Sequence, residues 1–206
     1  MIFLALAQLV QEQPSYFTEL KNDLPVHATA PVVPFFSQFT DIASPSWKKV
    51  GCGVTSLAMI IEYYRPGIIS VDSLLEEGIE AGAYLNDAGW TYAGLIGVSK
   101  KYGFVGESYV LGDLTKERAF AEFKKHLTEG PVIASVHYEF DPKSTIPHLV
   151  VINGIEGDVV YYNDPAAKGG NKTISTKKFL AAWKKRFIVV RRDESSPIAF
   201  SQLFGN

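Results

Sequence analysis

The apolar pattern of the sequence changes at Gly130-Pro131, and this change limits the folds that the chain can adopt. Before it, apolar residues recur at helical spacing in runs that end at glycine or proline, such as the run from Cys52 to Pro66. After it, short strand-like runs follow one another, and residues 154–158 form a turn between two of them. Consecutive strands joined by a hairpin pair antiparallel, so we predict an α+β fold with an antiparallel sheet.

The helical runs have apolar residues three or four positions apart, whereas the strand-like runs are short and rich in β-branched residues. We predict helices over residues 3–22, from Cys52 to before Pro66, from Ser70 through Ile79, between Gly89 and Gly103, from Thr115 to Gly130, and from a cap at Ser175 or Thr176 through Trp183. We predict strands over residues 131–138, 148–153, 159–163 and 187–191. Residues 25–34 are Pro-rich and predicted to be extended, and residues 40–50 are predicted to be a loop.

A chain of 206 residues is longer than one average domain and shorter than two. We predict an N-terminal helical extension over residues 1–30 and a domain over residues 31–206, with a helical lobe over about 31–130 and a sheet lobe over about 131–195. The apolar start is short and has no basic residue before Lys21, so it is interpreted as part of a helix rather than as a signal peptide. No window approaches transmembrane length.

The net charge of −2 comes from 20 basic and 22 acidic residues, which disfavours binding to a nucleic-acid backbone. The densest basic stretch, residues 184–186, precedes a strand-like run and is interpreted as a solvated strand end. Cys52 is the single cysteine, so neither an intrachain disulfide nor a multi-thiolate metal site can form. We therefore expect no nucleic-acid partner, no metal and no cofactor, and a monomer by default.

Cys52 is the first candidate for chemistry. It lies at the predicted start of a helix, whose N-terminal dipole favours a thiolate, and the small residues Gly51 and Gly53 leave room for a substrate backbone. The competing interpretation is that Cys52 is a small buried hydrophobic residue, which cysteine often is. Position alone does not separate these two interpretations.

A thiolate nucleophile needs a base, and among the four histidines we favour His148. It opens a predicted strand directly after Ile146-Pro147, so its side chain lies at a sheet end, where it can project into a cleft. His27 and His126 are expected to be solvated, and His137 lies inside a strand-like run.

The base needs a partner, and the oxyanion of an acyl-transfer reaction needs hydrogen-bond donors. If the predicted hairpin forms, Asp164 reaches the same sheet end as His148; an ordinary Asn-Asp-Pro turn is the alternative. Gln38 can supply a side-chain amide beside the helix N-terminus, although a loop glutamine is common. The four candidates follow one another in the order Gln, Cys, His, Asp, with a helix under the cysteine and a sheet under the last two.

The order and local sequence of these residues resemble the papain-like cysteine peptidases, in the branch similar to bacteriocin-processing (double-glycine) peptidases. The resemblance spans residues 33 to about 190, and the matching stretches are Val33 to Gln38, Gly51 to Met59, Gly89 to Leu95, Pro131 to Val136, His148 to Gly154, and Tyr162 to Pro165. Between Gln38 and Cys52 the spacing is longer than in papain.

By this resemblance Cys52 is the nucleophile, His148 the general base, Asp164 its orienting partner and Gln38 the oxyanion-hole glutamine. The family fold packs a helical lobe on an antiparallel sheet lobe, with the active-site cleft between them. Trp47 is a candidate for a substrate-contacting wall. Trp90 is a second candidate, although a core role is more common for such an aromatic residue.

These observations favour a cysteine peptidase that cleaves a peptide or isopeptide bond of a peptide or protein substrate through a Cys-His-Asp triad. One alternative is an NlpC-type cell-wall peptidase or amidase, which would place a third polar residue on the strand after His148. Another is a non-catalytic peptide-binding module with the same fold. The resemblance implies an extracellular or cell-surface location in a bacterium, and the residues themselves leave a cytoplasmic location open.

Overall fold

The computed structural model describes residues 30–86 and 88–195, and the predicted helical extension lies outside these residues. The helices are α1 (Pro45–Lys48), α2 (Cys52–Tyr64), α3 (Val71–Glu80), α4 (Tyr92–Lys100), α5 (Lys116–Thr128), the 3-10 helix η1 (Tyr138–Phe140) and α6 (Thr176–Ala182). The strands are β1 (Tyr84–Leu85), β2 (Gly89–Trp90), β3 (Phe104–Val110), β4 (Val132–His137), β5 (Pro147–Glu156), β6 (Val159–Asn163), β7 (Lys172–Ser175) and β8 (Trp183–Arg192).

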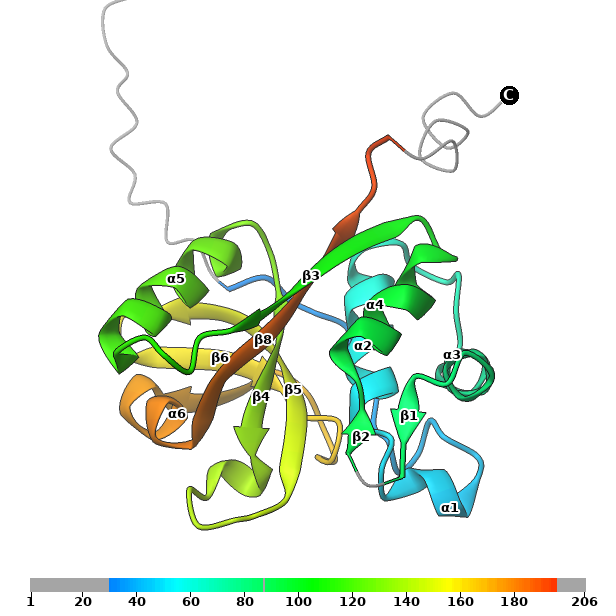
Figure 1. The fold of residues 1–206 in the computed structure, drawn as a ribbon, viewed down its shortest axis with the longest axis horizontal. Coiled ribbons are helices and arrows are strands. Elements are labelled where there is room, and N and C mark those ends of the chain that lie inside the picture. Colours follow the sequence, from blue (N-terminus) through cyan, green and yellow to red (C-terminus); the bar gives the residue numbers. More distant parts are fainter. Residues whose placement is uncertain (1–29, 87, 196–206) are drawn as a thin grey trace, which may run out of the picture.

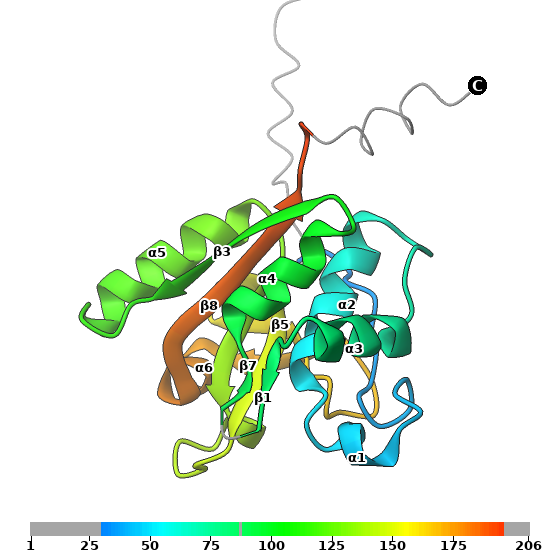
Figure 2. The same ribbon diagram turned by 45° about the vertical axis from the view of Figure 1, so that its right-hand side comes forward.

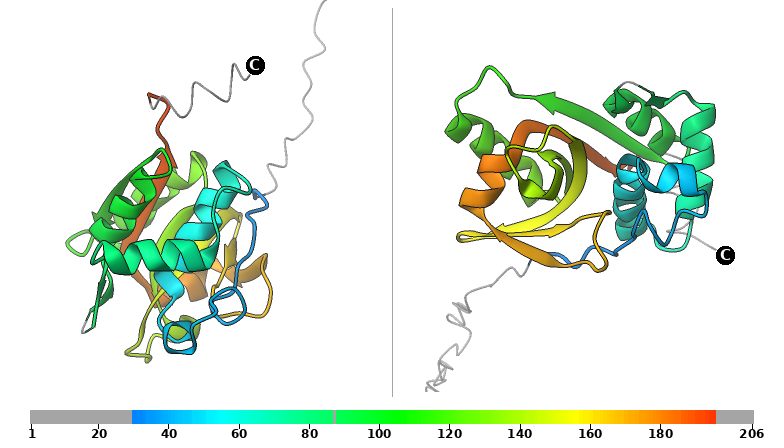
Figure 3. Two further views of the ribbon diagram at one scale, coloured as in Figure 1. Left: turned by 90° about the vertical axis from the view of Figure 1, so that its right-hand side faces the viewer. Right: turned by 90° about the horizontal axis from the view of Figure 1, so that it is seen from below.

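Six of these strands form one sheet in the order β3-β8-β4-β5-β6-β7, and every neighbouring pair is antiparallel. Helices α2, α3 and α4 lie on one side of it, and α5 and α6 lie on the other (Figures 1 and 2). In the view from below the sheet is strongly curved (Figure 3). The prediction of an α+β fold with an antiparallel sheet is confirmed.

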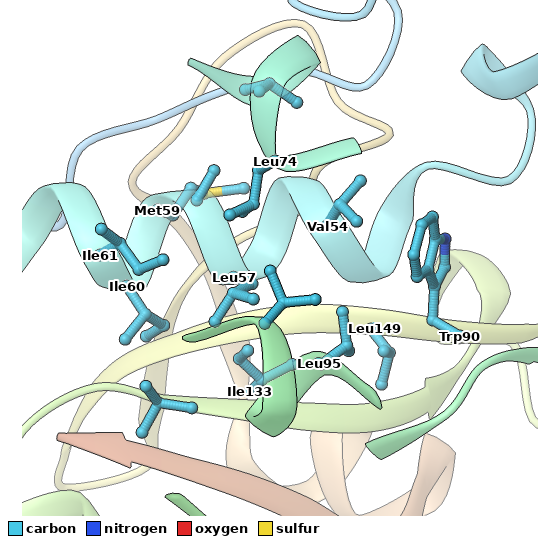
Figure 4. Packing of buried hydrophobic residues seen from close by; sticks show 14 of the residues in the cluster. Val54, Leu57, Met59, Ile60, Ile61, Leu74, Trp90, Leu95, Ile133 and Leu149 are labelled. Atoms are coloured by element: carbon cyan, nitrogen blue, oxygen red, sulfur yellow. The ribbon is translucent and has the colours of Figure 1, made fainter. Parts of the chain in front are cut away.

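Helix α2 is the centre of the helical side. Its residues from Gly53 to Ile61 are all buried, as expected of a helix that is covered on every face. Figure 4 shows Leu57 pointing toward Leu149 and Ile133 of the sheet, while Met59 points to the opposite side, toward Leu74 of α3. This packing fixes α2, and with it the residue at its first position, against strand β5.

Strands β4 and β5 are buried on both faces. Ile133 packs toward α2, whereas its neighbours Val132 and Ala134 pack in a second cluster with Phe123 of α5 and Phe179 of α6. Two covered faces explain why these strands are continuous apolar runs rather than alternating ones.

The structure adds elements that the sequence pattern did not predict. Within residues 40–50, which were predicted to be a loop, Pro45 occupies the first turn of the short helix α1, a position that proline favours. Strands β3 and β7 were also not predicted, and β8 begins at Trp183, earlier than expected. Because β3 and α5 pack on the sheet side, this side includes more of the chain than the predicted residues 131–195. The division of the chain into an N-terminal extension and a domain stays a prediction.

The segment that precedes α1 crosses the sheet toward the helical side (Figure 1), and we call residues 30–38 the N-terminal strap. The buried amide of Asn163 holds it by donating hydrogen bonds to the carbonyl oxygens of Val33 (3.0 Å) and Pro34 (3.2 Å). Pro165 accepts a hydrogen bond from the backbone N–H of Gln38 (2.8 Å). The turn after β6 therefore positions the strap. No helix in the part of the chain that the structure describes is long and apolar enough to cross a membrane.

Candidate active site

Cys52 is the first residue of α2, and its side chain is partly exposed. The first amides of a helix have no acceptor within the helix, so the N–H of Cys52 is available to a ligand. A Cβ atom at Gly51 would collide with Ile42, and one at Gly53 would lie 2.5 Å from the ring of Trp90. The two glycines are therefore required for close packing around the helix start, rather than for room beside the thiol.

His148 lies at the start of β5 and is 4% exposed. Its Nε2 atom lies 2.6 Å from Oδ1 of Asp164, and the same oxygen accepts a hydrogen bond from the backbone N–H of Ala166 (2.8 Å). The hairpin register, with Val151 opposite Asn163, brings Asp164 to the end of the sheet where His148 lies. Since Nε2 faces Asp164, Nδ1 is the ring nitrogen that remains for Cys52.

The environment of His148 favours the protonated ring. Burial by itself lowers the pKa of His148, but the hydrogen bond with Asp164, the interaction with Cys52 and the charges of both groups outweigh burial and raise the pKa to about 9. At neutral pH His148 is therefore an imidazolium between the sulfur of Cys52 and the carboxylate of Asp164.

Two contacts fix the histidine relative to the cysteine helix. Ser56, one turn after Cys52, donates a hydrogen bond from Oγ to the carbonyl oxygen of Leu149 (3.2 Å), next to His148. Tyr138 packs its ring edge-on against the imidazole, with ring centroids 5.2 Å apart. The first contact joins α2 directly to β5, and the second packs η1 against the imidazole and limits its freedom to turn.

Gln38 lies at the end of the strap and is 3% exposed. Its Nε2 donates a hydrogen bond to the carbonyl oxygen of Lys48 (2.7 Å). An amide nitrogen carries two protons, so this bond orients the side chain and leaves the second proton free. Gln38 also lines the cavity that contains Cys52.

A cavity of about 750 Å³ lies between the helical side and the sheet. Among its lining residues are Cys52, His148, Gln38 and Trp90, whereas Asp164 lies behind the histidine. Further lining residues were not predicted from the sequence: Lys49, Tyr84, Ser135, Tyr138, Lys184 and Arg186. They come from several parts of the chain, and the folded arrangement of helices and strands brings them to one cavity.

The predicted substrate-contacting residues have different positions. Trp90 lines the cavity but is only 6% exposed, and its Nε1 donates to the carbonyl oxygen of Val50 (2.6 Å). Trp47 does not line the cavity. Its ring packs edge-on against that of Tyr84, a lining residue, with the two ring centroids 5.0 Å apart. Gly51 is buried and also does not line the cavity. In residues 30–86 and 88–195, His, Cys, Asp and Glu form no group of three or more that could hold a metal ion.

An α+β fold that faces a cysteine at a helix N-terminus with a histidine on an antiparallel sheet, across a cleft, has the architecture of the papain-like cysteine peptidases. The profile of the Peptidase_C39 like family matches residues 32–187. The chain therefore belongs to the Peptidase_C39-like family, and the predicted resemblance to the double-glycine peptidases is confirmed. Comparison with curated proteins gives no match.

Solved structures share the fold. A double glycine motif protease from an AMS/PCAT transporter, in complex with the leader peptide, is 21% identical with a TM-score of 0.57, and the match covers 81% of this chain and 96% of that chain. The peptidase domain of Streptococcus ComA is 23% identical with a TM-score of 0.52, covering 70% and 93%. A C39-like peptidase from Bacillus anthracis is 22% identical with a TM-score of 0.52, covering 78% and 96%.

Proposed function

We propose that this protein is a thiol hydrolase that cleaves a peptide or isopeptide bond through a triad of Cys52, His148 and Asp164. The observation that carries the proposal is the position of His148, which is hydrogen-bonded to Asp164 on one side and interacts with Cys52 on the other, in the wall of one cavity. A nucleophile, a base and a group that orients the base are the parts that acyl transfer needs.

In the proposed reaction, the proton of Cys52 resides on Nδ1 of His148 and the Sγ thiolate attacks the scissile carbonyl carbon. Collapse of the tetrahedral intermediate breaks the C–N bond, and His148 gives its proton to the leaving amine. Water then attacks the thioester as His148 accepts one of its protons, which releases the carboxylic acid and regenerates the thiol. Asp164 holds the ring and stabilises its positive charge through both steps.

The oxyanion is stabilised by the backbone N–H of Cys52 and by the second Nε2 proton of Gln38. Both groups lie at the start of α2, where the helix dipole adds to the stabilisation of a developing negative charge. The hydrogen bond from Gln38 to Lys48 holds the amide in place before the reaction begins. This arrangement lets the donors act without reorganising.

The proposed substrate is a peptide or an extended protein segment. The structurally similar double glycine motif protease is in complex with a leader peptide, which supports a peptide as the ligand of this protein. A cavity of about 750 Å³ is of the size that binds a segment of a few residues.

The alternatives have less support. An NlpC-type site would need a polar residue on the strand after His148, but Val150 and Ile152 are buried apolar residues of the core. A non-catalytic module has no need of an imidazolium beside a thiol, and such a module would tolerate loss of Cys52 or His148. Both residues are present.

The test is to incubate the purified protein with a pool of peptides, including double-glycine sequences, and to identify products by mass spectrometry. The proposal expects product pairs whose masses add up to the substrate plus one water. A pool that stays intact, with peptidoglycan fragments cleaved instead, would support the NlpC-type alternative.

Replacing Gln38 with alanine tests the oxyanion assignment. We expect kcat to fall by about 10²- to 10³-fold, as on loss of one oxyanion donor, with little change in KM. Alkylation of Cys52 should keep its wild-type rate, because the hydrogen bond of the Gln38 side chain goes to Lys48 rather than to His148. An unchanged kcat in a folded Gln38→Ala protein would remove Gln38 from the mechanism.

A further inference from the structure

The cavity that contains Cys52 is lined by several cationic side chains. Lys49, Lys184 and Arg186 are among its lining residues, and none of the lining residues within 30–86 and 88–195 is an aspartate or a glutamate. The chain as a whole carries a net charge of −2, so this local excess of positive charge is not a property of the surface in general.

The backbone of β8 explains how two of these cations reach the cavity. Arg186 is paired with Ser135 and Trp183 with Val136, and the register shifts between these pairs, which leaves Lys184 and Lys185 in a β-bulge. Lys185 has a φ of 54° and turns away from the cavity, where its Nζ donates hydrogen bonds to the carbonyl oxygens of Gly112 (2.5 Å) and Leu114 (2.8 Å). Lys184 and Arg186 remain on the cavity side of the strand.

Lys184 and Arg186 have no ion-pair partner in the part of the chain that the structure describes. Lys184 is partly buried and Arg186 is exposed, so their stems can lie along the protein while the charged groups stay accessible to a ligand. A concave site with apolar walls concentrates the field of such charges toward a bound anion.

The distance of Lys184 and Arg186 from His148 determines how far from the scissile bond an anionic group of the substrate would lie. Strand β4 separates β8 from β5, the strand that carries His148. Two strand spacings amount to about 10 Å, and an extended peptide advances about 3.3 Å per residue. With the reach of the Lys184 and Arg186 side chains included, the anion belongs to a residue about two to four positions from the scissile bond.

We propose that the sheet end of the cleft, at Lys184 and Arg186, binds a carboxylate of the substrate; this inference rests on the proposed peptidase function. The carboxylate is either an aspartate or glutamate side chain or the free carboxyl terminus of a short peptide. Glu139 and Asp141, which would favour a basic substrate group, line a separate cavity and are not among the lining residues of the cavity that contains Cys52.

The test uses matched peptides around one cleaved sequence. At each of the four positions on either side of the scissile bond, a glutamate peptide is compared with its glutamine counterpart, and each is made with a free and an amidated carboxyl terminus. The wild-type protein is compared with Lys184→Gln/Arg186→Gln. The control is Lys172→Gln/Lys177→Gln, which removes two exposed charges remote from the cavity. The same peptides are titrated into Cys52→Ala protein, and binding is followed by fluorescence anisotropy.

We expect an acidic group to favour cleavage at one place in the peptide. Either glutamate at one position, or a free carboxyl terminus, should raise kcat/KM by about 10- to 100-fold over the neutral peptide. This preference should fall below about twofold in Lys184→Gln/Arg186→Gln, remain in the control, and shrink at high salt because exposed charges are screened. A glutamate effect identifies a side chain as the source of the carboxylate, and an effect confined to the free terminus identifies a carboxyl-terminal substrate.

The two proposals fail in different ways. Cleavage without any acid preference, or a preference that the double variant keeps, overturns the carboxylate site and leaves the peptidase proposal intact. If wild-type protein cleaves no peptide but Cys52→Ala protein binds glutamate peptides more tightly than glutamine peptides, the carboxylate site stands and the peptidase proposal fails. Equal binding of acidic and neutral peptides together with no cleavage overturns both.

Discussion

Replacing Cys52 with alanine is expected to lower kcat/KM for peptide cleavage by about 10⁵-fold or more, because no other group can form the thioester. The fold should be retained, since Cys52 is partly exposed at the first position of α2 and its loss leaves the helix core from Val54 to Ile61 intact. The measurement is kcat/KM on one cleaved peptide for wild-type and variant protein, with thermal unfolding followed in parallel.

Cys52→Ser serves as the matched variant, because it keeps the size and polarity of the side chain. We expect it to be nearly as inactive as Cys52→Ala, because a hydroxyl group is a far weaker nucleophile than a thiolate at neutral pH. Activity within tenfold of wild type in Cys52→Ala would place the nucleophile elsewhere and overturn the proposed mechanism.

Replacing Asp164 with asparagine is expected to lower kcat by about 10³- to 10⁴-fold, the scale of effect seen when the acid of a triad becomes an amide. The carboxylate is one of the groups that raise the pKa of His148 to about 9, and it accepts the hydrogen bond that orients the ring. An amide removes the negative charge and leaves the shape of the side chain almost unchanged.

The pH profile separates this role from a purely structural one. Because the pKa of His148 is raised, the imidazolium that protonates the leaving amine is present at neutral pH and is lost as pH rises through about 9. Wild-type kcat/KM should therefore fall on the alkaline side near that pH, and in Asp164→Asn the fall should begin at lower pH. An alkaline limb that does not move in a folded Asp164→Asn protein would contradict the assignment of Asp164.

Local signals were sufficient to predict much of the fold. Helix α2 follows from its apolar spacing and ends before Pro66. The hairpin of β5 and β6 was predicted, but its turn is residues 157–158 rather than 154–158, because residues 154–156 extend β5 and pair with β6. Strand β3 was not predicted because it is a sheet edge on which Phe104 is the one buried residue, so its polar sequence lacks an apolar period. A strand of this kind is specified by its partner β8 rather than by its own pattern.

The same distinction applies to the site. The positions of Cys52, His148 and Asp164 could be predicted because each follows from a local feature, namely a helix start, a strand start and a hairpin end, whereas their catalytic roles stay a proposal. Lys184 and Arg186 were interpreted as a solvated strand end. Their position beside the cleft was missed because it depends on the bulge in β8 and on the pairing of β8 with β4. Trp47 was expected on the substrate wall, but packing with Tyr84 places it behind that wall.

The most direct test of the account is the pH dependence of Cys52 alkylation by iodoacetamide in wild-type protein and in His148→Ala. A thiolate paired with the imidazolium of His148 predicts a wild-type rate that changes little between about pH 8.5 and about pH 6. In His148→Ala the rate should fall about tenfold per pH unit over the lower part of this range, as it does for free cysteine. Identical profiles that both follow free cysteine would contradict the thiolate–imidazolium pair.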